Sequence, residues 1–516
     1  IWPQRRGAAP TPPPPTLIST LTPPSMLWCA LVLPDLALQV FTRGRSDAGP
    51  LAILGPRPQL RVVAADPAAV ACGVEPGISR ASALALAPQL HLRERAPALE
   101  SAALAEIATW AGRFTSSISL DPPDTLLLEI QASLRLFGGL APLCTSIGES
   151  LGELGFAGQL AVAPTPLAAR WLARCSPGSL IDAEAGLAAA LAPLPITVVA
   201  DGCGGAVTTE NLDLLAGIGI HCLADVQRLP RSGLARRHAR AVTTQLDRAY
   251  AIVPDPRPWF VPPERYVVHL PLPAPTDQVD TLVFGVRRLL AGLSGWLDAR
   301  QAGLERFTLV LEYERHRQGS EIREEPREIV LGALSRDMTR CQMLAREHLT
   351  RGPLPAPVDA LRLEADAPRL LTPPRTDLFD GDDGQQGDPG LLLATLRARL
   401  GHAAVQCLAA HPDHRPERAW RWAEPIPGDR TGPHAALDLP SSPRPLWLLP
   451  TPRPMARPPA ESLLAGPERI EAGWWDGPGA DVSRDYFVAR SHDDCLVWIF
   501  QERLPPHGWF VHGYFS

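Results

Sequence analysis

Carboxylates at two places in this sequence have the chemistry to bind a divalent metal ion. Asp121 and Asp124 flank a Pro-Pro pair, and Asp35 follows an apolar run much earlier in the chain. Mg²⁺ is a hard cation that takes oxygen ligands, so such side chains are its natural partners. Asp is also common at Pro-containing turns for structural reasons, which is the alternative interpretation of Asp121 and Asp124.

Other metal-binding patterns are weak. His411, Asp413 and His414 lie close together but lack further ligands, so we interpret them as part of a loop. The nine cysteines are scattered without a C-x-x-C pair, which argues against a zinc ribbon and a disulfide framework and fits a reducing cytosol. We therefore expect a cytoplasmic protein with no metal and no cofactor.

Arginine clusters are the candidates for binding DNA. The sequence has no lysine, so all 49 basic residues are arginines, and the formal net charge of -6 means that only local patches could attract DNA. Gly217 and Gly219 fall in a turn between short helical segments, where backbone N–H groups could meet a phosphate. A solvated arginine face on a structural helical pair is the alternative. The arginines that follow this turn are Arg228, Arg231, Arg236 and Arg237.

Short apolar runs and amphipathic stretches predict the elements that position these residues. Strands are expected at 27–33, 51–54, 60–64, 125–130, 307–314 and 358–365. Helices are expected at 79–87, 99–114, 134–152, 165–174 and 337–349. YFVAR and CLVWIF flank a polar turn near the C-terminus and predict a hairpin. No apolar run reaches the roughly 18 residues that a membrane span needs.

The order of these segments resembles a Y-family (DinB/UmuC-like) translesion DNA polymerase, and within that family the noncatalytic ImuB type. The resemblance implies an α+β, multidomain, right-hand polymerase-like body with palm, fingers, thumb and little finger, followed by a disordered linker and a small β-rich C-terminal region. The first 25 residues are Pro-rich and lack a continuous apolar run, so we interpret them as disordered, with Met26 as a plausible initiator. The expected divisions are 1–25 disordered N-terminal extension, 26–45 palm start, 46–95 fingers-like, 96–200 palm, 201–255 helical thumb, 256–372 little finger-like α+β domain, 373–390 clamp-binding linker and 391–516 C-terminal partner-binding region.

Two motifs that hold the catalytic metal ions in this family have lost their ligands. In LVLPDLALQV, Leu31 and Leu33 occupy the two Asp positions of the family's D-x-D strand. In SISLDPPDTLLLEI, Asp124 falls on the catalytic Asp, but Thr125 replaces the neighbouring Glu. One carboxylate cannot hold two Mg²⁺ ions roughly 3.5–4 Å apart. The vestigial catalytic positions are therefore expected to be inactive.

The residues that contact the incoming triphosphate in this family are also replaced. Pro67 and Val70 stand where the family has Tyr and Arg, although Gly73 and Gly77 of the same motif are kept. Pro166 stands where a triphosphate-facing Lys is expected. Each charge-assisted hydrogen bond lost in this way is worth about 1.5–3 kcal/mol, so we expect no nucleotide binding.

A short motif after the little finger-like region resembles the sliding-clamp-binding pentapeptide Q-L-[SD]-L-F. Leu378 and Phe379 would be its apolar anchors, while Arg375 replaces the Gln. The motif consists of Arg375, Thr376, Asp377, Leu378 and Phe379. The resemblance further implies a RecA-like accessory protein and an error-prone DnaE-type polymerase as partners of the aromatic-rich C-terminal region. Aromatic residues there also favour a small β core.

These observations favour a noncatalytic adaptor in error-prone translesion synthesis and the SOS response to DNA damage, with DNA, the clamp and the DnaE-type polymerase as partners. Two alternatives stay open. The first is an active, divergent translesion polymerase that uses Asp121, Asp124 or Asp35 in another metal arrangement. The second is a DNA-binding protein without clamp or polymerase partners.

Overall fold

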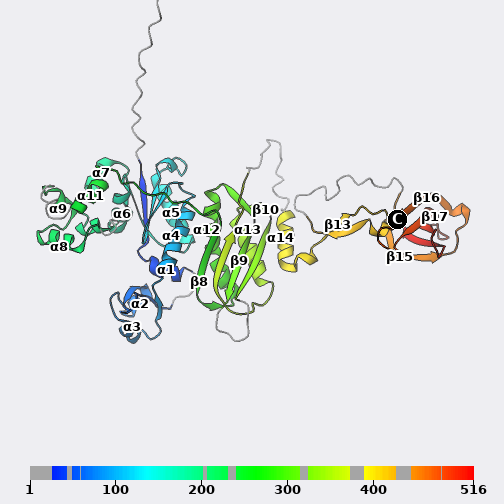
Figure 1. Ribbon diagram of the computed structural model, residues 1–516, viewed down its shortest axis with the longest axis horizontal. Helices are drawn as coiled ribbons and strands as arrows, with labels where there is room; N and C mark the ends of the chain where they lie inside the picture. Colours follow the sequence, from blue (N-terminus) through cyan, green and yellow to red (C-terminus); the bar gives the residue numbers. More distant parts are fainter. Residues whose placement is uncertain are drawn as a thin grey trace, which may run out of the picture. The chain divides into compact units, whose positions relative to one another are not determined.

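The computed structural model of the chain describes two compact units (Figure 1). The first unit comprises Ile1–Glu328, Ser335–Ala345 and Pro353–Pro373, and the second comprises Ile329–Leu334, Arg346–Gly352 and Pro374–Ser516. The described residues are 26–43, 49–58, 60–201, 206–230, 240–313, 323–371, 389–425, 443–477 and 479–515. Within these ranges, no helix is both long and apolar enough to cross a membrane.

A four-stranded antiparallel sheet with the order β5-β6-β1-β7 lies in the first unit (Figure 1). Its strands are β1 (Trp28–Val32), β5 (Ile118–Asp121), β6 (Thr125–Glu129) and β7 (Gln159–Ala163). β1 is apolar throughout because both of its faces are covered. Cys29 and Leu31 pack towards α4 and α5, whereas Trp28 and Ala30 pack towards α6. These helices are α4 (Pro97–Ala111), α5 (Leu140–Glu153) and α6 (Pro166–Cys175).

Helix α5 begins later than the periodicity predicts. The sequence pattern predicts a helix from residue 134, but the chain first makes a 3-10 turn and α5 starts at Leu140. Gly138 and Gly139 have φ values of 76° and 120°, which an α-helix cannot contain. Glycine adopts these angles readily, so the pair interrupts the helix although the apolar spacing continues through it.

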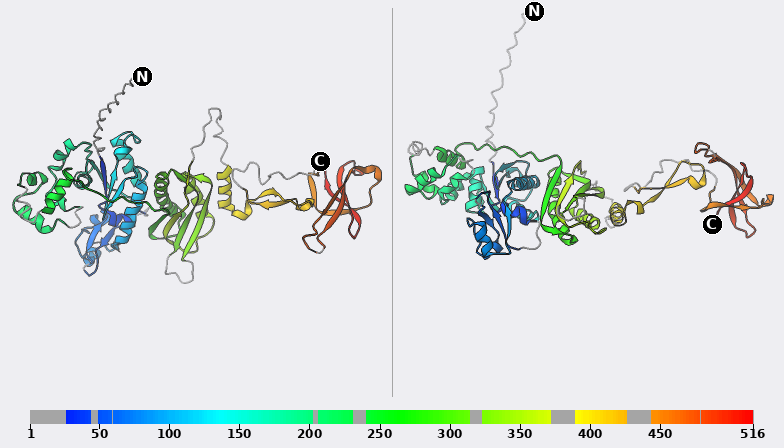
Figure 2. Two further views of the ribbon diagram at one scale, coloured as in Figure 1. Left: turned by 45° about the horizontal axis from the view of Figure 1, so that its top comes forward. Right: turned by 60° about the horizontal axis from the view of Figure 1, so that its bottom comes forward.

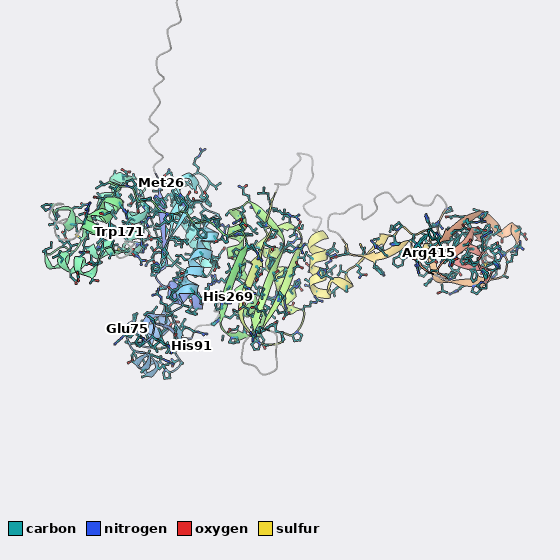
Figure 3. All side chains as sticks on the ribbon, viewed as in Figure 1. Met26, Glu75, His91, Trp171, His269 and Arg415 are labelled. Carbon is teal, nitrogen blue, oxygen red and sulfur yellow. The ribbon has the colours of Figure 1, made fainter. Side chains whose placement is uncertain are left out.

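Two smaller substructures lie in the regions expected to form fingers and thumb. The first has a three-stranded sheet of order β3-β2-β4 with two helices. Its elements are β2 (Leu51–Leu54), β3 (Val62–Ala65), β4 (His91–Glu94), α2 (Pro67–Ala71) and α3 (Arg80–Leu86). The second is helical and shares a hydrophobic core with Trp171 of α6 (Figure 3). It contains α7 (Glu184–Leu191), η2 (Ile196–Ala200), α8 (Thr209–Gly217), α9 (Leu223–Gln227) and α11 (Arg240–Ala249).

The region expected to be little finger-like alternates strands and helices, as its sequence pattern predicts. It forms a sheet of order β10-β9-β11-β8, with β12 paired to β9. Helix α12 packs closely on α4. The approach is so close that a Cβ at Gly295 would lie only 2.7 Å from the Cα of Trp110. The elements are β8 (Tyr266–Thr276), α12 (Val279–Asp298), β9 (Ala302–Tyr313), β10 (Glu324–Ser335), α13 (Met338–Thr350), β11 (Val358–Ala365) and β12 (Arg369–Leu370).

The C-terminal part of the second unit is a twisted five-stranded antiparallel sheet of order β15-β19-β18-β17-β16 (Figure 2). The predicted hairpin is present as β17–β18. Strand β15 contains Pro450, Pro452 and Pro454, and it lies at a sheet edge, where a missing N–H is tolerated. The strands are β15 (Trp447–Met455), β16 (Leu463–Ala472), β17 (Val482–Arg490), β18 (Leu496–Glu502) and β19 (Gly508–Tyr514). Preceding elements are α14 (Pro389–Leu400), β13 (Cys407–Ala410), η5 (Pro416–Arg418) and β14 (Trp420–Ala423).

Candidate functional site

The opening strand offers no oxygen ligand at the two positions where the family has carboxylates. The side chains of Leu31 and Leu33 are buried in the core formed with α4 and α5. The backbone N–H of Leu33 donates to the carbonyl oxygen of Asp124 at 2.8 Å, so the end of β1 lies beside the turn that carries Asp124. A leucine there cannot coordinate Mg²⁺, which requires oxygen ligands.

The β5–β6 hairpin gathers the other vestigial residues around one turn. Asp121 ends β5 and is paired with Thr125, the first residue of β6. Thr125 is buried, and its Oγ1 donates to Oδ1 of Asp124 at 2.9 Å. Asp35 lies exposed just before α1 (Leu36–Thr42). Two carboxylates therefore face the same turn, as their spacing around the Pro-Pro pair suggests.

Two arginines of helix α6 bind these carboxylates. Nη2 of Arg174 lies 2.6 Å from Oδ1 of Asp124, and its Nε lies 2.6 Å from Oδ2 of Asp201. Arg170, one turn earlier, donates to both carboxylate oxygens of Asp201 at 2.8 Å. Its Nη1 lies 2.5 Å from Oδ2 of Asp121. The hairpin is thus joined to α6 by charge-assisted hydrogen bonds on both sides of its turn.

A third arginine, from the Pro-rich segment at 254–264, reaches Asp121. Nη1 of Arg257 lies 3.0 Å from Oδ2 of Asp121, and its Nη2 lies 2.7 Å from Asp255. We call Arg170, Arg174 and Arg257, together with Asp121, Asp124 and Asp201, the Arg–Asp network. It ties the hairpin to α6, to the residue that follows η2, and to the segment that leads into β8.

Burial makes this network depend on complete pairing. The Arg170 side chain is only 2% exposed. Burial opposes its charge, but the hydrogen bonds and attraction from Asp201 and Asp121 outweigh this effect and raise the pKa of Arg170. A buried charge that has lost its partner is strongly destabilising. Arg170 therefore stays cationic, and the carboxylates around it are neutralised by guanidinium groups.

The residues present do not fit a pair of magnesium ions. A two-metal centre needs carboxylates that can bridge two cations roughly 3.5–4 Å apart. Here the oxygens of Asp121 and Asp124 accept N–H donors from positively charged side chains, which would also repel a metal ion. Across the described ranges, no three His, Cys, Asp or Glu side chains are grouped so that they could hold a metal. We derive no phosphoryl-transfer step from this site.

The positions expected to contact a triphosphate serve as helix starts or surface. Pro67 begins α2, where Oδ1 of Asp66 accepts from the N–H of Ala69 at 2.7 Å. Val70 is an exposed apolar residue of the same helix. Pro166 begins α6, in the first turn, where proline is well tolerated. None of the three side chains carries a charge with which to bind phosphate.

The Arg–Asp network is the part of the site that the sequence did not reveal. Arg170 and Arg174 are four residues apart, so their side chains lie on one face of α6, and this spacing is a readable signal. Their shared partner, Asp201, and the third arginine, Arg257, are distant in sequence. The fold alone brings them to the hairpin.

The glycine turn proposed to meet a phosphate has little spare donor capacity. Gly217 ends α8, and Gly219 has a φ of 82° in the turn before α9. The backbone N–H groups of Ile218, Gly219 and Ile220 all donate to carbonyl oxygens of the preceding helical turn. Arg228 is 81% exposed, with its Nη1 3.8 Å from Asp225. Arg231, Arg236 and Arg237, and the clamp-type motif at 375–379, lie outside the described residues.

Comparison with known proteins bears on this degenerate centre. Residues 43–174 match the impB/mucB/samB (IMS) family. Over 483 residues the chain is 28% identical to protein ImuB of *Caulobacter vibrioides*, in strain NA1000 / CB15N and in strain ATCC 19089 / CIP 103742 / CB 15, covering 86% of this chain and 100% of the relative.

Solved structures similar to this chain include a Dbh ternary complex with partially disordered substrates and DinB from *Sulfolobus solfataricus*. Their TM-scores are 0.37 and 0.36, each at 16% identity, covering 67% of this chain and 100% of the other.

Residues 43–174 therefore resemble an impB/mucB/samB (IMS) domain of the Y-family type. The chain is a homologue of ImuB, and this confirms the resemblance drawn from its sequence motifs.

Proposed function

We propose that this protein is a noncatalytic adaptor in error-prone translesion synthesis and damage-induced mutagenesis. The observation that carries the proposal is the ion pair between Arg174 and Asp124, because the one carboxylate retained at a catalytic position is bound to an arginine. The buried Leu31 and Leu33 support it, since they leave the same region without further ligands. Similarity to ImuB over most of the chain is consistent with this role.

As an adaptor, the protein would act by proximity. It would hold DNA through sequence-independent contacts to phosphates, dock on the sliding clamp through residues 375–379, and bind a RecA-like accessory protein and an error-prone DnaE-type polymerase through its C-terminal region. Tethering two modules in this way makes the second binding event intramolecular and raises the effective concentration of the active polymerase at the lesion. The chemistry of nucleotide addition would then belong to the partner.

Primer extension tests this proposal directly. The purified full-length chain is incubated with primed template, nucleotides and either Mg²⁺ or Mn²⁺, with and without the clamp. We expect no extension by the chain alone, and faster lesion bypass when the chain is added to the DnaE-type polymerase and clamp.

Extension by the chain alone that disappears in Asp124→Ala would overturn the noncatalytic assignment and favour an active, divergent polymerase. DNA binding without any measurable affinity for the clamp, the accessory protein or the polymerase would favour a DNA-binding protein that is no adaptor. The two failures are distinguishable because the first is an activity and the second a binding measurement.

A further inference from the structure

The loop between β16 and β17, described at residues 473–477 and 479–481, presents two adjacent tryptophans to solvent. Trp474 is 76% exposed and Trp475 is 52% exposed. Their ring centroids lie 5.1 Å apart in an edge-to-face arrangement. Isolated exposed apolar residues are ordinary, but contiguous exposed apolar surface marks interaction sites. We call this segment the Trp474–Trp475 loop.

Arg415 fixes both ends of the Trp474–Trp475 loop. Its Nη2 donates to Oδ2 of Asp476, next to the tryptophans, and its Nη1 donates to the carbonyl oxygen of Ala480 at the far end, 3.3 Å away. Arg415 is only 3% exposed, and its Nε and Nη2 also donate to the carboxylate of Asp413. Gly473 lies so close that a Cβ there would be 2.5 Å from Nη1. A buried arginine with hydrogen bonds from all three of its nitrogens thus orders the loop.

A second arginine, Arg418, links the same loop to another pair of exposed tryptophans. Arg418 donates to Oδ2 of Asp476 at 2.6 Å, and the chain continues from it directly into β14. There Trp420 and Trp422 are 49% and 61% exposed, with ring centroids 5.6 Å apart. Two tryptophan pairs are therefore tied to one ion-pair cluster.

Charge around the loop distinguishes between kinds of partner. The cations Arg415 and Arg418 face the anions Asp413 and Asp476, so the cluster is neutral. Proteins that stack bases of single-stranded DNA on aromatic rings combine the rings with a positively charged groove, which this neutral cluster does not supply. The cores of protein–protein interfaces are instead depleted of net charge and enriched in tryptophan and arginine.

We propose that the Trp474–Trp475 loop is the docking element for a protein partner whose surface offers an apolar pocket with a rim of low net charge. The proposal rests on the adaptor function and locates one of its contacts. Trp474 is the anchor that enters the pocket, and Trp475 packs beside it. Because Arg415 already orders the loop, little conformational entropy is lost when the partner binds.

The test uses the full-length chain and the two purified candidate partners, the RecA-like accessory protein and the DnaE-type polymerase, in calorimetric binding titrations. Trp474→Ala/Trp475→Ala is expected to weaken binding to one of them about a hundredfold or more, the scale of a truncated interface hot spot. Trp447→Ala is the matched control, because Trp447 is 69% exposed on the same sheet. It should change the affinity less than threefold.

A second variant separates loop order from apolar area. Asp476→Asn keeps all four tryptophans but weakens the bonds to Arg415 and Arg418, and it should reduce affinity about tenfold while hydrogen exchange rises in residues 473–481. That outcome would show that the order of the loop contributes to affinity. An unchanged affinity despite faster exchange would show that partner binding does not need an ordered loop.

Three results would overturn the docking site itself. The first is equal partner affinity for the wild type and Trp474→Ala/Trp475→Ala. The second is a loss confined to binding of single-stranded oligonucleotide. The third is self-association of the wild type that the double variant abolishes, which would make the occupant a second copy of the chain. If the wild type binds neither candidate partner, the adaptor function fails as well.

Discussion

The guanidinium of Arg174 lies 2.6 Å from the carboxylate of Asp124, the acidic residue that the resemblance to the Y-family motif places at a catalytic position. The positive charge beside that carboxylate comes from a side chain of α6. The same helix supplies Arg170 to Asp121 on the other side of the turn. Cationic side chains of the protein itself therefore neutralise the hairpin that would carry metal ligands in an active enzyme.

The Arg–Asp network should stabilise the β5–β6 hairpin. Arg170→Ala removes a buried partner from Asp121 and Asp201, and we expect a loss of about 3–5 kcal/mol. Arg174→Ala should have a smaller effect, about 1–2 kcal/mol, because its side chain is 26% exposed. Native-state hydrogen exchange of the β6 amides measures both effects.

Arg113→Ala is the control for this prediction. Arg113 pairs with Asp298 at 2.9 Å, and its exposed fraction of 29% is similar to the 26% of Arg174. It lies outside the network. It should leave exchange in β6 unchanged. A double-mutant cycle between Arg174→Ala and Asp124→Ala with no coupling energy would contradict the stabilising role.

Restoring a carboxylate on β1 should damage the fold without restoring a metal site. Leu31→Asp places an acidic group in a fully apolar core, where an uncompensated polar group costs roughly 2–7 kcal/mol. Leu31→Met, which keeps volume and polarity, should cost less than about 1.5 kcal/mol. Urea unfolding, without Mg²⁺ and with millimolar Mg²⁺, measures the free energy of unfolding of both variants. Recovery of Leu31→Asp by Mg²⁺ would show that the site still accepts a metal.

The sequence was sufficient where one local pattern determines one element. The all-apolar β1, the alternation in β11 and the hairpin β17–β18 could each be predicted, because burial on one or both faces leaves a direct trace in residue type. Strand β15 could not, because its three prolines are compatible with a strand only at a sheet edge, and the edge is a property of the sheet.

The candidate site divides in the same way. The presence of leucines at positions 31 and 33, where the Y-family motif has carboxylates, can be read from the chain, since it concerns residue types in a motif. The ion pairs that Asp121 and Asp124 form with arginines cannot be read in this way, because Asp201 and Arg257 reach the hairpin only through tertiary packing. Sequence reasoning therefore predicted an inert site from residue types alone, whereas the structure adds that Asp121 and Asp124 are paired with arginines.

Stability of the C-terminal sheet should fall in mild acid through His512. This residue is buried beside the stacked rings of Tyr486 and Trp498, and burial, opposed by Glu417, lowers its pKa to about 4. In the unfolded chain its pKa is about 6.5, so between these values the unfolded state binds more protons. The contribution is full above about pH 6.5 and is lost as the pH falls towards 4, at most roughly 3 kcal/mol.

Hydrogen exchange of the β18 and β19 amides between pH 4 and 8, corrected for intrinsic rates, would show this dependence. His512→Asn should flatten the profile over that range. His507→Asn, at an exposed position in the turn between β18 and β19, is the control and should leave it unchanged. A wild-type profile that is already flat would contradict the expected titration.

Clamp binding should depend on the two apolar anchors of the motif at 375–379. Leu378→Ala/Phe379→Ala should abolish measurable binding, since each removes a side chain that fills an apolar groove. Leu392→Ala/Leu400→Ala is the control, because both leucines are 60% exposed on α14. Surface plasmon resonance on immobilised clamp compares the two variants. Unchanged binding by the first would exclude this motif as the docking peptide.

DNA binding should be carried by the arginines that follow the glycine turn, and its salt dependence can be used to count them. The turn's own N–H groups at 218–220 are used internally, so side-chain cations must supply most of the attraction. If Arg236 and Arg237 each neutralise a phosphate, Arg236→Ala/Arg237→Ala should weaken binding uniformly across sequences. It should also reduce the slope of log affinity against log salt by about 2, close to one per contact. Fluorescence anisotropy at several salt concentrations measures the slope.

Arg469→Ala, which removes an exposed arginine paired with Asp485 on the C-terminal sheet, is the control and should leave the slope unchanged. An unaltered slope in the double variant would move the DNA contact away from this cluster, because counterion release reports the number of phosphate contacts whatever the sequence bound.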